Sequence, residues 1–306
     1  MRRIDRRRFE VRPGELLCVI CVRNERLRLP YTLDYHRRLG VDRFLIVDNL
    51  SDDGSTEMLL AESDVHVFVA EERYSESGYG VQWINSLLDA YAVDHWALTV
   101  DADELLVYPG CEKLSLQDLT AHLDGRGEQA LLTFLLDMYS DRQIRETLYT
   151  TGRPFLDSCP YFDVDSYSWE PTNETRGRVP SRGGPRDRVF WAGNDRGRPA
   201  PFLPKIPLVR WRRGLAYQAS THVLPGVRVS AMTGVLMHFK FFSDFTDRVA
   251  EEAVRGEHWQ DAGQYGVYRK VLEENPGLNM HYRQSVRYED SQQLVDLGLM
   301  HTPSSP

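Results

Sequence analysis

The stretch Leu98–Glu104 reads LTVDADE, an apolar run followed by three carboxylates within four residues. Apolar runs of this kind form strands buried in a sheet, and Asp101 or Asp103 inside such a core would carry a large desolvation cost. We therefore expect both carboxylates at the carboxyl end of the strand, where open α/β sheets bind ligands. Carboxylates on an extended tip are hard oxygen ligands suited to Mg²⁺ or Mn²⁺ with a substrate's phosphates. A solvated acidic turn is the alternative.

Strand and helix signals alternate through the first hundred residues. Apolar runs without alternation predict strands buried on both faces, and a helix is predicted between Pro30 and Gly40, residues that favour a helix start and a helix end. The predicted strands span 16–22, 44–47, 65–69 and 96–100, and the predicted helices span 30–39, 55–60 and 81–91. This alternation favours an α/β fold with a parallel, doubly wound sheet.

The pattern changes after residue 104. Further helices are predicted over 116–123, 245–257 and 265–274, and further strands over 130–136, 205–211 and 235–242. The Gly-, Pro-, Arg- and Asp-rich sequence from 150 to 204 is interpreted as functional loops over the sheet, since long structureless loops are uncommon otherwise. The predicted organisation is a flexible basic arm (1–14), an α/β domain (15–245), a C-terminal helical extension (246–300) and a disordered tail (301–306).

Composition restricts the class of protein. The chain has 306 residues, 42% of them hydrophobic, and a net charge of −8. The apolar fraction suffices for a sizeable core, whereas the negative charge argues against nonspecific nucleic-acid binding. We see no run near the roughly 20 apolar residues of a membrane span, and four cysteines do not indicate a disulfide scaffold, so a cytoplasmic protein is expected. The basic N-terminus fits a solubilising tail or a peripheral contact with an anionic membrane.

Three motifs follow strand ends in a fixed order. They are Arg23-Asn24-Glu25, then Asp48-Asn49-x-Ser51-x-Asp53-Gly54-Ser55, then Asp101-x-Asp103-Glu104. Together they resemble the GT-A-fold glycosyltransferases, and within them the family 2-like group, to which the segments 183–190, 205–209 and 238–240 are also similar. The likeness covers about residues 15–245. It implies a GT-A-type, Rossmann-like, mostly parallel sheet flanked by helices, with a nucleotide-binding half (15–104) and an acceptor side (105–245).

The resemblance implies a nucleotide-diphosphate sugar donor, with a UDP-sugar favoured. It also implies a Mn²⁺ or Mg²⁺ ion that neutralises the charge of the departing diphosphate. Asp103 is then expected as a direct metal ligand, and Asp101 as a contact to the ribose, the metal or its water shell. His238, which follows an apolar run, is a candidate to complete the coordination, although a histidine near a strand end often has a structural role.

Other residues are expected to bind the nucleotide sugar. They are Arg23, Glu25, Asp48, Asp53, Asp101, Arg186, Arg188 and Lys240. Asp48 is expected to accept hydrogen bonds from the nucleobase or ribose, and Asp53 to line the same pocket besides shaping a turn and capping a helix. The basic side chains are candidates to neutralise phosphate oxygens. Glu25 equally suits the start of the following helix.

The resemblance implies an inverting transfer, which needs a group to take the acceptor's proton. Asp187, Asp195 and Glu170 are the candidates for this base, with His222 as a fourth. The interpretation is a metal-dependent, hexosyltransferase-like enzyme with a glycan, lipid-linked or small-molecule acceptor. A nucleotidyltransferase is an alternative, but residues 22–25 hold no glycine where its phosphate loop would lie. A non-catalytic nucleotide-sugar-binding module is a third hypothesis.

Overall fold

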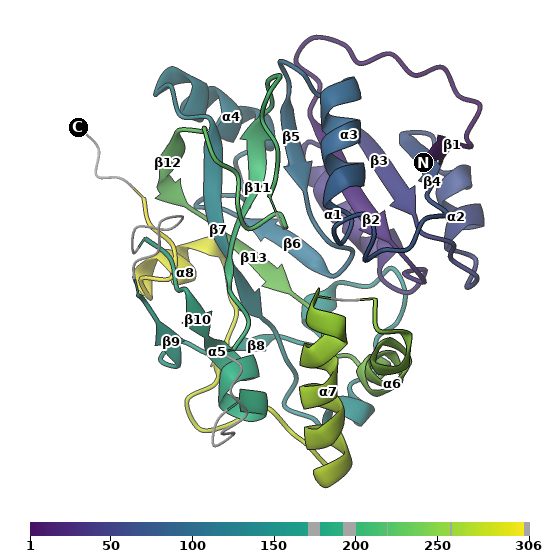
Figure 1. Cartoon of the computed structure of the whole chain (residues 1–306). Helices are drawn as coiled ribbons and strands as arrows, with labels where there is room; N and C mark the ends of the chain where they lie inside the picture. Colours follow the sequence, from purple (N-terminus) through teal and green to yellow (C-terminus); the bar gives the residue numbers. More distant parts are fainter. Residues whose placement is uncertain (171–177, 192–199, 219, 258, 303–306) are drawn as a thin grey trace.

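The protein is built around a ten-stranded sheet, seen in a computed structural model (Figure 1). The structure describes residues 1–170, 178–191, 200–218, 220–257 and 259–302, without the side chains of 259–262. The strands follow the order β1-β4-β3-β2-β5-β11-β7-β13-β6, and β12 pairs with β7. Helices flank this sheet, so the predicted α/β class is confirmed.

The first half of the chain forms the parallel part of the sheet. Its strands are β2 (Leu17–Val22), β3 (Arg43–Asp48), β4 (Val65–Val69) and β5 (Trp96–Thr99), and its helices are α1 (Leu29–Leu39), α2 (Ser55–Ala61) and α3 (Val81–Tyr91). β2 pairs in parallel with β3 and β5, and β3 with β4. The strands are almost entirely buried, as expected of apolar runs covered on both faces.

The strand order reverses beside β2. β3 and β4 lie on one side of β2, whereas β5 lies on the other. The connections that leave β2 and β5 therefore diverge at a topological switch point, the place at which open α/β sheets bind ligands. Arg23 follows β2 and Asp101 lies just beyond β5, so two of the three motifs meet there.

The second half of the sheet is mixed. Its elements are β6 (Glu104–Val107), α4 (Leu116–Gly125), β7 (Ala130–Asp137), β11 (Pro204–Arg210), β12 (Val229–Thr233) and β13 (Val235–His238). β11 inserts antiparallel between β5 and β7 and joins the two halves. β13 is shorter than the predicted strand over 235–242: its pairing with β6 ends at the hydrogen bond from the Phe239 backbone N–H to the carbonyl of Asp103, at 2.8 Å.

The N-terminal segment lies along the edge of the sheet, whereas a flexible arm was expected over residues 1–14. β1 (Arg2–Arg3) pairs antiparallel with β4. Next to it, the Asp5 carboxylate, only 1% exposed, accepts hydrogen bonds from Arg3 at 2.8 and 2.7 Å and lies 3.3 Å from His66 Nδ1. These contacts with β4 fasten the segment, and a local charge pattern does not reveal them.

The described C-terminal part holds three helices: the first contacts the loops after β2 and β3, the second packs on the first, and the third contacts the segment after β6 (Figure 1). They are α6 (Phe245–Arg255), α7 (Trp259–Glu274) and α8 (Ser291–Asp296). Residues of α6 and α7 form a second, aromatic-rich core with the preceding loops. Arg28, which is 1% exposed and precedes α1, donates to both carboxylate oxygens of Asp244 at 2.8 Å. This paired contact holds the start of α6 in place.

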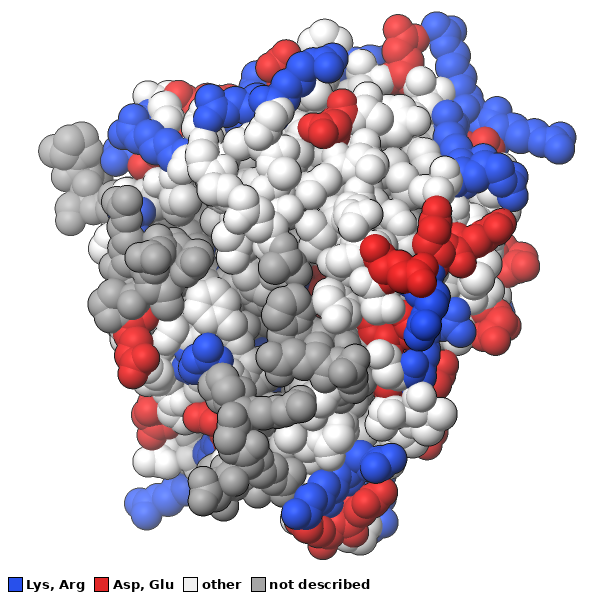
Figure 2. Space-filling view, viewed as in Figure 1, with Lys and Arg blue, Asp and Glu red and all other residues white. Residues whose placement is uncertain are grey.

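The face shown in Figure 2 carries charges of both signs. Basic side chains gather at the upper right, over the N-terminal segment, and acidic side chains lie below them in the region of α2. Within the described ranges, no helix has the length and apolarity needed to cross a bilayer.

Short elements connect β7 to β11 and complete the C-terminal part. They are β8 (Tyr161–Phe162), β9 (Tyr167–Ser168), β10 (Arg182–Gly183), α5 (Gly184–Arg186) and β14 (Val286–Arg287), with 3₁₀ turns at Ile144–Glu146 and Phe155–Asp157 and a π-helical turn at Asp187–Trp191. Gly183 lets two backbones approach closely: its φ is 108°, and a Cβ there would lie 2.2 Å from the carbonyl oxygen of Ser166.

Gly183→Ala is expected to destabilise the protein by about 3 kcal/mol. A left-handed backbone costs an L-residue about 1–2 kcal/mol, and the backbone contact adds an overpacking cost of about 1–3 kcal/mol. Urea unfolding measures this loss. Gly214→Ala is the matched control, because φ there is 87° and a Cβ would meet nothing within 4 Å. Equal losses in the two variants would contradict the close approach at Gly183.

Candidate active site

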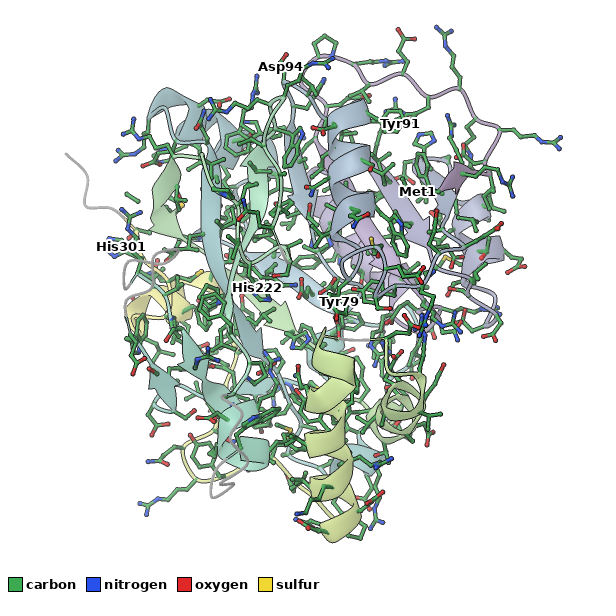
Figure 3. All side chains as sticks on the ribbon, in the orientation of Figure 1. Met1, Tyr79, Tyr91, Asp94, His222 and His301 are labelled. Atoms are coloured by element: carbon green, nitrogen blue, oxygen red, sulfur yellow. The ribbon has the colours of Figure 1, made fainter. Side chains whose placement is uncertain are left out.

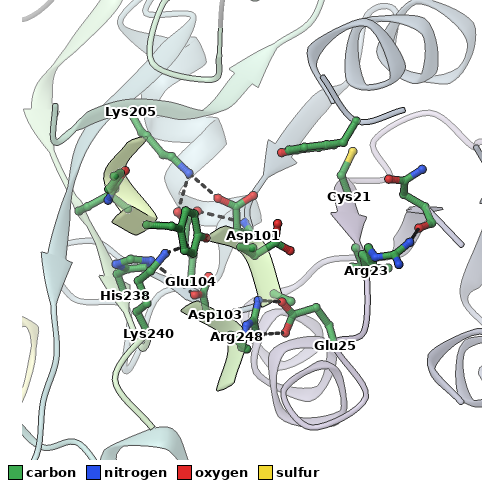
Figure 4. A pocket seen from close by; sticks show the side chains of 18 of the residues that line it. Cys21, Arg23, Glu25, Asp101, Asp103, Glu104, Lys205, His238, Lys240 and Arg248 are labelled. Carbon is green, nitrogen blue, oxygen red and sulfur yellow. Dashed lines mark hydrogen bonds and ion pairs between the residues drawn. The ribbon is translucent and has the colours of Figure 1, made fainter. Parts of the chain in front are cut away.

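A pocket of about 320 Å³ opens at the switch point (Figure 4). Its walls come from the end of β2, the turn between β5 and β6, the start of β11, the end of β13 and residues of α6 and α7. Six Lys and Arg side chains and five Asp and Glu side chains line it, whereas the whole chain holds 37 basic and 45 acidic residues. The pocket therefore concentrates positive charge relative to the rest of the protein.

The turn between β5 and β6 holds its three carboxylates in different environments. The side chain of Asp101 is 59% exposed, that of Asp103 is 14% exposed, and that of Glu104 is 1% exposed. The Thr32 hydroxyl donates to the carbonyl of Ala102, and the Glu104 backbone N–H donates to the carbonyl of Asp101 at 3.1 Å. These bonds fix the turn, and Asp101 and Asp103 lie just beyond the strand end, as predicted.

Lys205 of β11 joins Asp101 and Glu104 (Figure 4). Its Nζ lies 2.9 Å from Asp101 Oδ2 and 2.5 Å from Glu104 Oε1, and Glu104 Oε2 accepts the Asp101 backbone N–H at 3.0 Å. Burial and the Asp101 charge raise the pKa of Glu104 to about 7, despite the ammonium beside it. Burial alone would lower the pKa of Lys205, but the two carboxylates hold it above its ordinary value. Lys205 therefore stays charged.

A second network joins Asp103, His238 and Asp137. His238 Nε2 lies 3.4 Å from Asp103 Oδ2, and His238 Nδ1 lies 2.6 Å from Asp137 Oδ1. Asp137 also accepts a hydrogen bond from Arg186 Nε at 2.6 Å. Burial opposes ionisation of Asp103, but the His238 ring and then the Lys240 ammonium hold the pKa of this carboxyl well below its usual range. Asp103 therefore presents an anion to the pocket.

Asp137 is a member of this site that the sequence reasoning missed. It is the last residue of β7 and lies opposite His238 in the parallel pairing of β7 with β13. The sequence did contain a signal for Asp137: this carboxylate directly follows the predicted strand over 130–136, just as Asp101 directly follows its own predicted strand. A carboxylate that holds one ring nitrogen of a histidine orients the other nitrogen toward a metal.

The donor atoms of Asp103 and His238 fit a shared divalent cation. Two ligands at about 2.1 Å from one ion, at right angles, lie about 3 Å apart, near the 3.4 Å that separates Asp103 Oδ2 from His238 Nε2. Within the described ranges, no group of three or more His, Cys, Asp or Glu side chains forms a complete metal site. A two-residue site leaves the other positions to phosphates and water, as is usual for Mg²⁺ bound with a substrate.

Lys240 and Arg23 line the pocket without a carboxylate partner in the described part of the chain. Lys240 Nζ lies 3.4 Å from the hydroxyl of Tyr265 and 5.1 Å from its ring centre. Arg23 donates to the backbone carbonyls of Asn49 and Leu50 at 3.0 and 3.2 Å. Because no described carboxylate lies within 4 Å of either cation, both can still donate hydrogen bonds to an anionic ligand.

The C-terminal helix α6 supplies part of the wall. Arg248 donates to both oxygens of Glu25, at 3.0 and 2.5 Å, and Arg255 donates to Asn49 Oδ1 at 3.2 Å. Arg248, Glu252 and Arg255 are spaced by three or four residues, which places them on one face of the helix. That spacing was visible in the sequence, but it does not reveal what the polar face contacts. The helical extension therefore completes the pocket.

Three residues expected at the donor site do not line this pocket. Asp48 is 1% exposed, and both its oxygens accept hydrogen bonds from the segment 51–56. Asp53 accepts backbone N–H groups in the same region. Arg188 makes two hydrogen bonds to Asp163, at 2.8 and 3.0 Å. In each case protein donors or acceptors already occupy the polar group, so these residues shape the fold around the pocket.

The candidates for the catalytic base also differ in whether they line the pocket. Glu170 is exposed, Asp187 is half-buried, and neither lines the pocket, whereas Asp195 lies outside the described residues. His222 does line it. The other predicted site residues that line the pocket are Arg23, Glu25, Asp101, Asp103, Arg186, His238 and Lys240.

Comparison with known proteins gives a partial sequence match. No family model matches the chain. The chain is 32% identical over 117 residues to a glycosyltransferase family 92 protein of Oryza sativa subsp. japonica. That match covers 35% of this chain and 18% of the rice protein, so the chain spans about a fifth of its relative's length.

Two solved structures show a weaker likeness. One is glucosyl-3-phosphoglycerate synthase from Mycobacterium tuberculosis in complex with phosphoglyceric acid. It is 17% identical, the match covers 47% of this chain and 50% of that chain, and the TM-score is 0.27. The other is 4-diphosphocytidyl-2C-methyl-D-erythritol synthase from Anaerococcus prevotii. It is 10% identical, the match covers 93% of this chain and 97% of that chain, and the TM-score is 0.28. Scores this low carry no argument about function.

The fold and the site together define an α/β protein with a GT-A-like fold. The strand order around the switch point, the acidic turn beside it and the likeness to a family 92 glycosyltransferase support this class. The narrower likeness to the family 2-like group stays a prediction.

Lys205→Met is expected to destabilise the protein more as the pH rises. It leaves the Glu104 carboxylate, 1% exposed, without its cation, and an unpaired buried charge costs about 3–5 kcal/mol. A carboxyl whose pKa is raised by folding binds its proton more tightly in the folded state, so stability falls above the unfolded-state pKa of about 4.3. The wild type, whose Glu104 pKa is about 7, loses the same stability up to that pH, so urea unfolding should show a deficit relative to the wild type that grows from about pH 6 to about pH 9.

Lys270→Met is the matched control for this prediction. Lys270 is 60% exposed and lies 3.7 Å from Glu274, and exposed pairs contribute less than about 1 kcal/mol. Its deficit should be small and similar at both pH values. A pH-independent deficit in the Lys205 variant would contradict the role assigned to this ammonium.

Proposed function

We propose that the protein is a metal-dependent, inverting glycosyltransferase. It transfers a hexose-like sugar from a nucleotide-diphosphate donor to a hydroxyl of a glycan, lipid-linked or small-molecule acceptor. The observation that carries the proposal is the Asp103–His238 pair in the pocket at the switch point, with Lys240 on the same side (Figure 4). The partial likeness to a family 92 glycosyltransferase supports the same class of reaction.

The charges of the pocket favour a diphosphate leaving group. A Mn²⁺ or Mg²⁺ ion held by Asp103 and His238 would supply Lewis-acid stabilisation of the diphosphate oxygens. Lys240 would bind a further phosphate oxygen, because a charge-assisted hydrogen bond is strong when the cation has no competing carboxylate. Arg186 and Arg248 are already paired with Asp137 and Glu25, so they contribute less charge to a ligand.

The nucleoside is assigned to the opposite side of the pocket. In Figure 4, Cys21 and Arg23 lie across the pocket from His238 and Lys240. A donor whose diphosphate lies at the metal site would therefore extend its nucleoside toward Arg23, beside the aromatic ring of Tyr74. The motif resemblance favours uridine as the nucleoside.

Nucleotidyl transfer is the competing reaction, and its products differ. In sugar transfer the bond between the anomeric carbon and the diphosphate breaks and a nucleoside diphosphate is released, whereas nucleotidyl transfer releases pyrophosphate. Two parallel incubations of the protein with Mn²⁺ separate them, one with UDP-, GDP- and dTDP-sugars and the other with the nucleoside triphosphates and a sugar 1-phosphate, each followed by product analysis. Pyrophosphate formation would overturn the proposal, and binding without any turnover would favour a binding module.

Asp103→Asn is expected to lower sugar transfer by at least about 1,000-fold, equivalent to about 4 kcal/mol of transition-state stabilisation. It removes the anionic metal ligand with little change of shape. Electron paramagnetic resonance should show weaker Mn²⁺ binding by the variant. Asp34→Asn, at a position 53% exposed on α1, is the control and should match the wild type. Full turnover by the Asp103 variant at saturating Mn²⁺ would remove Asp103 from the site.

Lys240→Gln is expected to weaken UDP binding about tenfold, because it removes one charge-assisted hydrogen bond worth about 1.5–3 kcal/mol. Isothermal titration of UDP in the presence of Mn²⁺ measures the change. Lys113, an exposed residue outside the pocket, provides the control Lys113→Gln. Indistinguishable UDP affinities in the two variants would show that Lys240 does not contact the diphosphate.

A further inference from the structure

The carboxylates of the pocket already face cations. Each of the five that line it lies within 3.4 Å of a basic side chain, in the pairs Glu25–Arg248, Asp101–Lys205, Glu104–Lys205, Asp103–His238 and Glu252–Arg255. A carboxylate oxygen that accepts hydrogen bonds from a cation has fewer lone pairs left for a substrate proton. Glu104 has a raised pKa, but it is 1% exposed and both its oxygens are engaged. Among the described residues that line the pocket, a histidine outside these pairs is a further candidate to accept the proton of an acceptor hydroxyl.

His222 lies on a tight turn beside β11. The backbone N–H of Gln218 donates to the carbonyl of Val223 at 2.9 Å, and the backbone N–H of Ile206 donates to the carbonyl of Thr221 at 3.1 Å. The turn is thus closed on itself and attached to the strand. His222 lines the pocket, and Figure 3 shows it near the centre of the molecule.

The tautomer of His222 follows from its hydrogen bond. Nδ1 contacts the carbonyl oxygen of Pro204. A carbonyl oxygen only accepts hydrogen bonds, so Nδ1 carries the hydrogen and Nε2 holds a lone pair. Burial, followed by the charge of Lys205, lowers the pKa of His222 to about 4, with Arg186 acting in the same direction and Asp101 opposing. The ring is therefore neutral near pH 7.

We propose that Nε2 of His222 is the general base of the sugar transfer, an inference that rests on the proposed function. The acceptor oxygen forms a bond to the anomeric carbon while its proton passes to Nε2. The bond between the anomeric carbon and the diphosphate oxygen breaks, and its electron pair leaves with the nucleoside diphosphate. After product release, the imidazolium returns the proton to water.

β11 holds this base in a fixed relation to the acidic turn. Pro204 binds the His222 ring through its carbonyl, and the next residue, Lys205, binds Asp101 at 2.9 Å. The ring of Phe202 packs against His222 with a centroid separation of 5.8 Å. Consecutive residues of one strand therefore position the base and the turn that carries the metal ligand, which is the kind of rigid placement that proton transfer requires.

The test compares His222→Asn with the wild type. The asparagine amide can still donate to the Pro204 carbonyl, but it offers no basic nitrogen. We expect kcat to fall by about 10²–10⁴-fold, with the UDP affinity in Mn²⁺ unchanged within about twofold. His95→Asn is the matched control, since His95 Nδ1 lies 3.0 Å from the carbonyl oxygen of Glu15, outside the pocket.

The outcomes separate this inference from the proposed function. A large loss of kcat in His222→Asn with unchanged UDP binding supports the base. Sugar transfer at the wild-type rate by His222→Asn would show that His222 is not the general base, and it would leave the proposed function intact. Loss of UDP binding or of folding in both His222→Asn and His222→Gln indicates a structural role and overturns the base. Pyrophosphate release by the wild type overturns both proposals.

Discussion

The site depends on the cost of burying charge. The three carboxylates that follow β5 cannot enter the core of the sheet without losing hydration, so they lie at its end, where cations from other segments reach them. Lys205 comes from β11 and His238 from β13, more than a hundred residues further along the chain. Buried ion pairs of this kind contribute little net stability, because desolvation offsets their attraction. Their main effect is to fix where each charged group stands.

Local sequence patterns were sufficient to predict the strands of the parallel half of the sheet. The strand predicted over 16–22 is observed at Leu17–Val22, since an apolar run bounded by polar residues leaves few alternatives. It was the motif resemblance that predicted a shared site for Asp103 and His238, whose side chains lie 3.4 Å apart. The sequence could not indicate which polar residue after a strand faces a ligand. Asp48 and Asp103 follow buried strands alike, but donors of its own loop engage Asp48.

Partners distant in the chain account for the other differences. Asp5 fastens the N-terminal segment through His66, and Arg248 reaches Glu25 across 223 positions. Helical spacing shows that Arg248 shares a face with Glu252, but only the packed structure shows that this face lines the pocket. Composition and periodicity describe segments one at a time, and these contacts are decided by how segments pack.

β11 is the element whose geometry matters most for the chemistry, and its irregularity has a physical reason. The ladder between β11 and β7 changes register between Lys205 and Leu208, and Pro207, which has no N–H to donate, lies within that shift. A bulge bends its strand and re-aims the side chains beside it. If the ladder kept the register of Leu208 throughout, Lys205 would be displaced by one residue and would point to the other face of the sheet, away from Asp101. The Pro204 carbonyl would also move away from His222. Proline at this position thus favours the irregular ladder that serves both contacts.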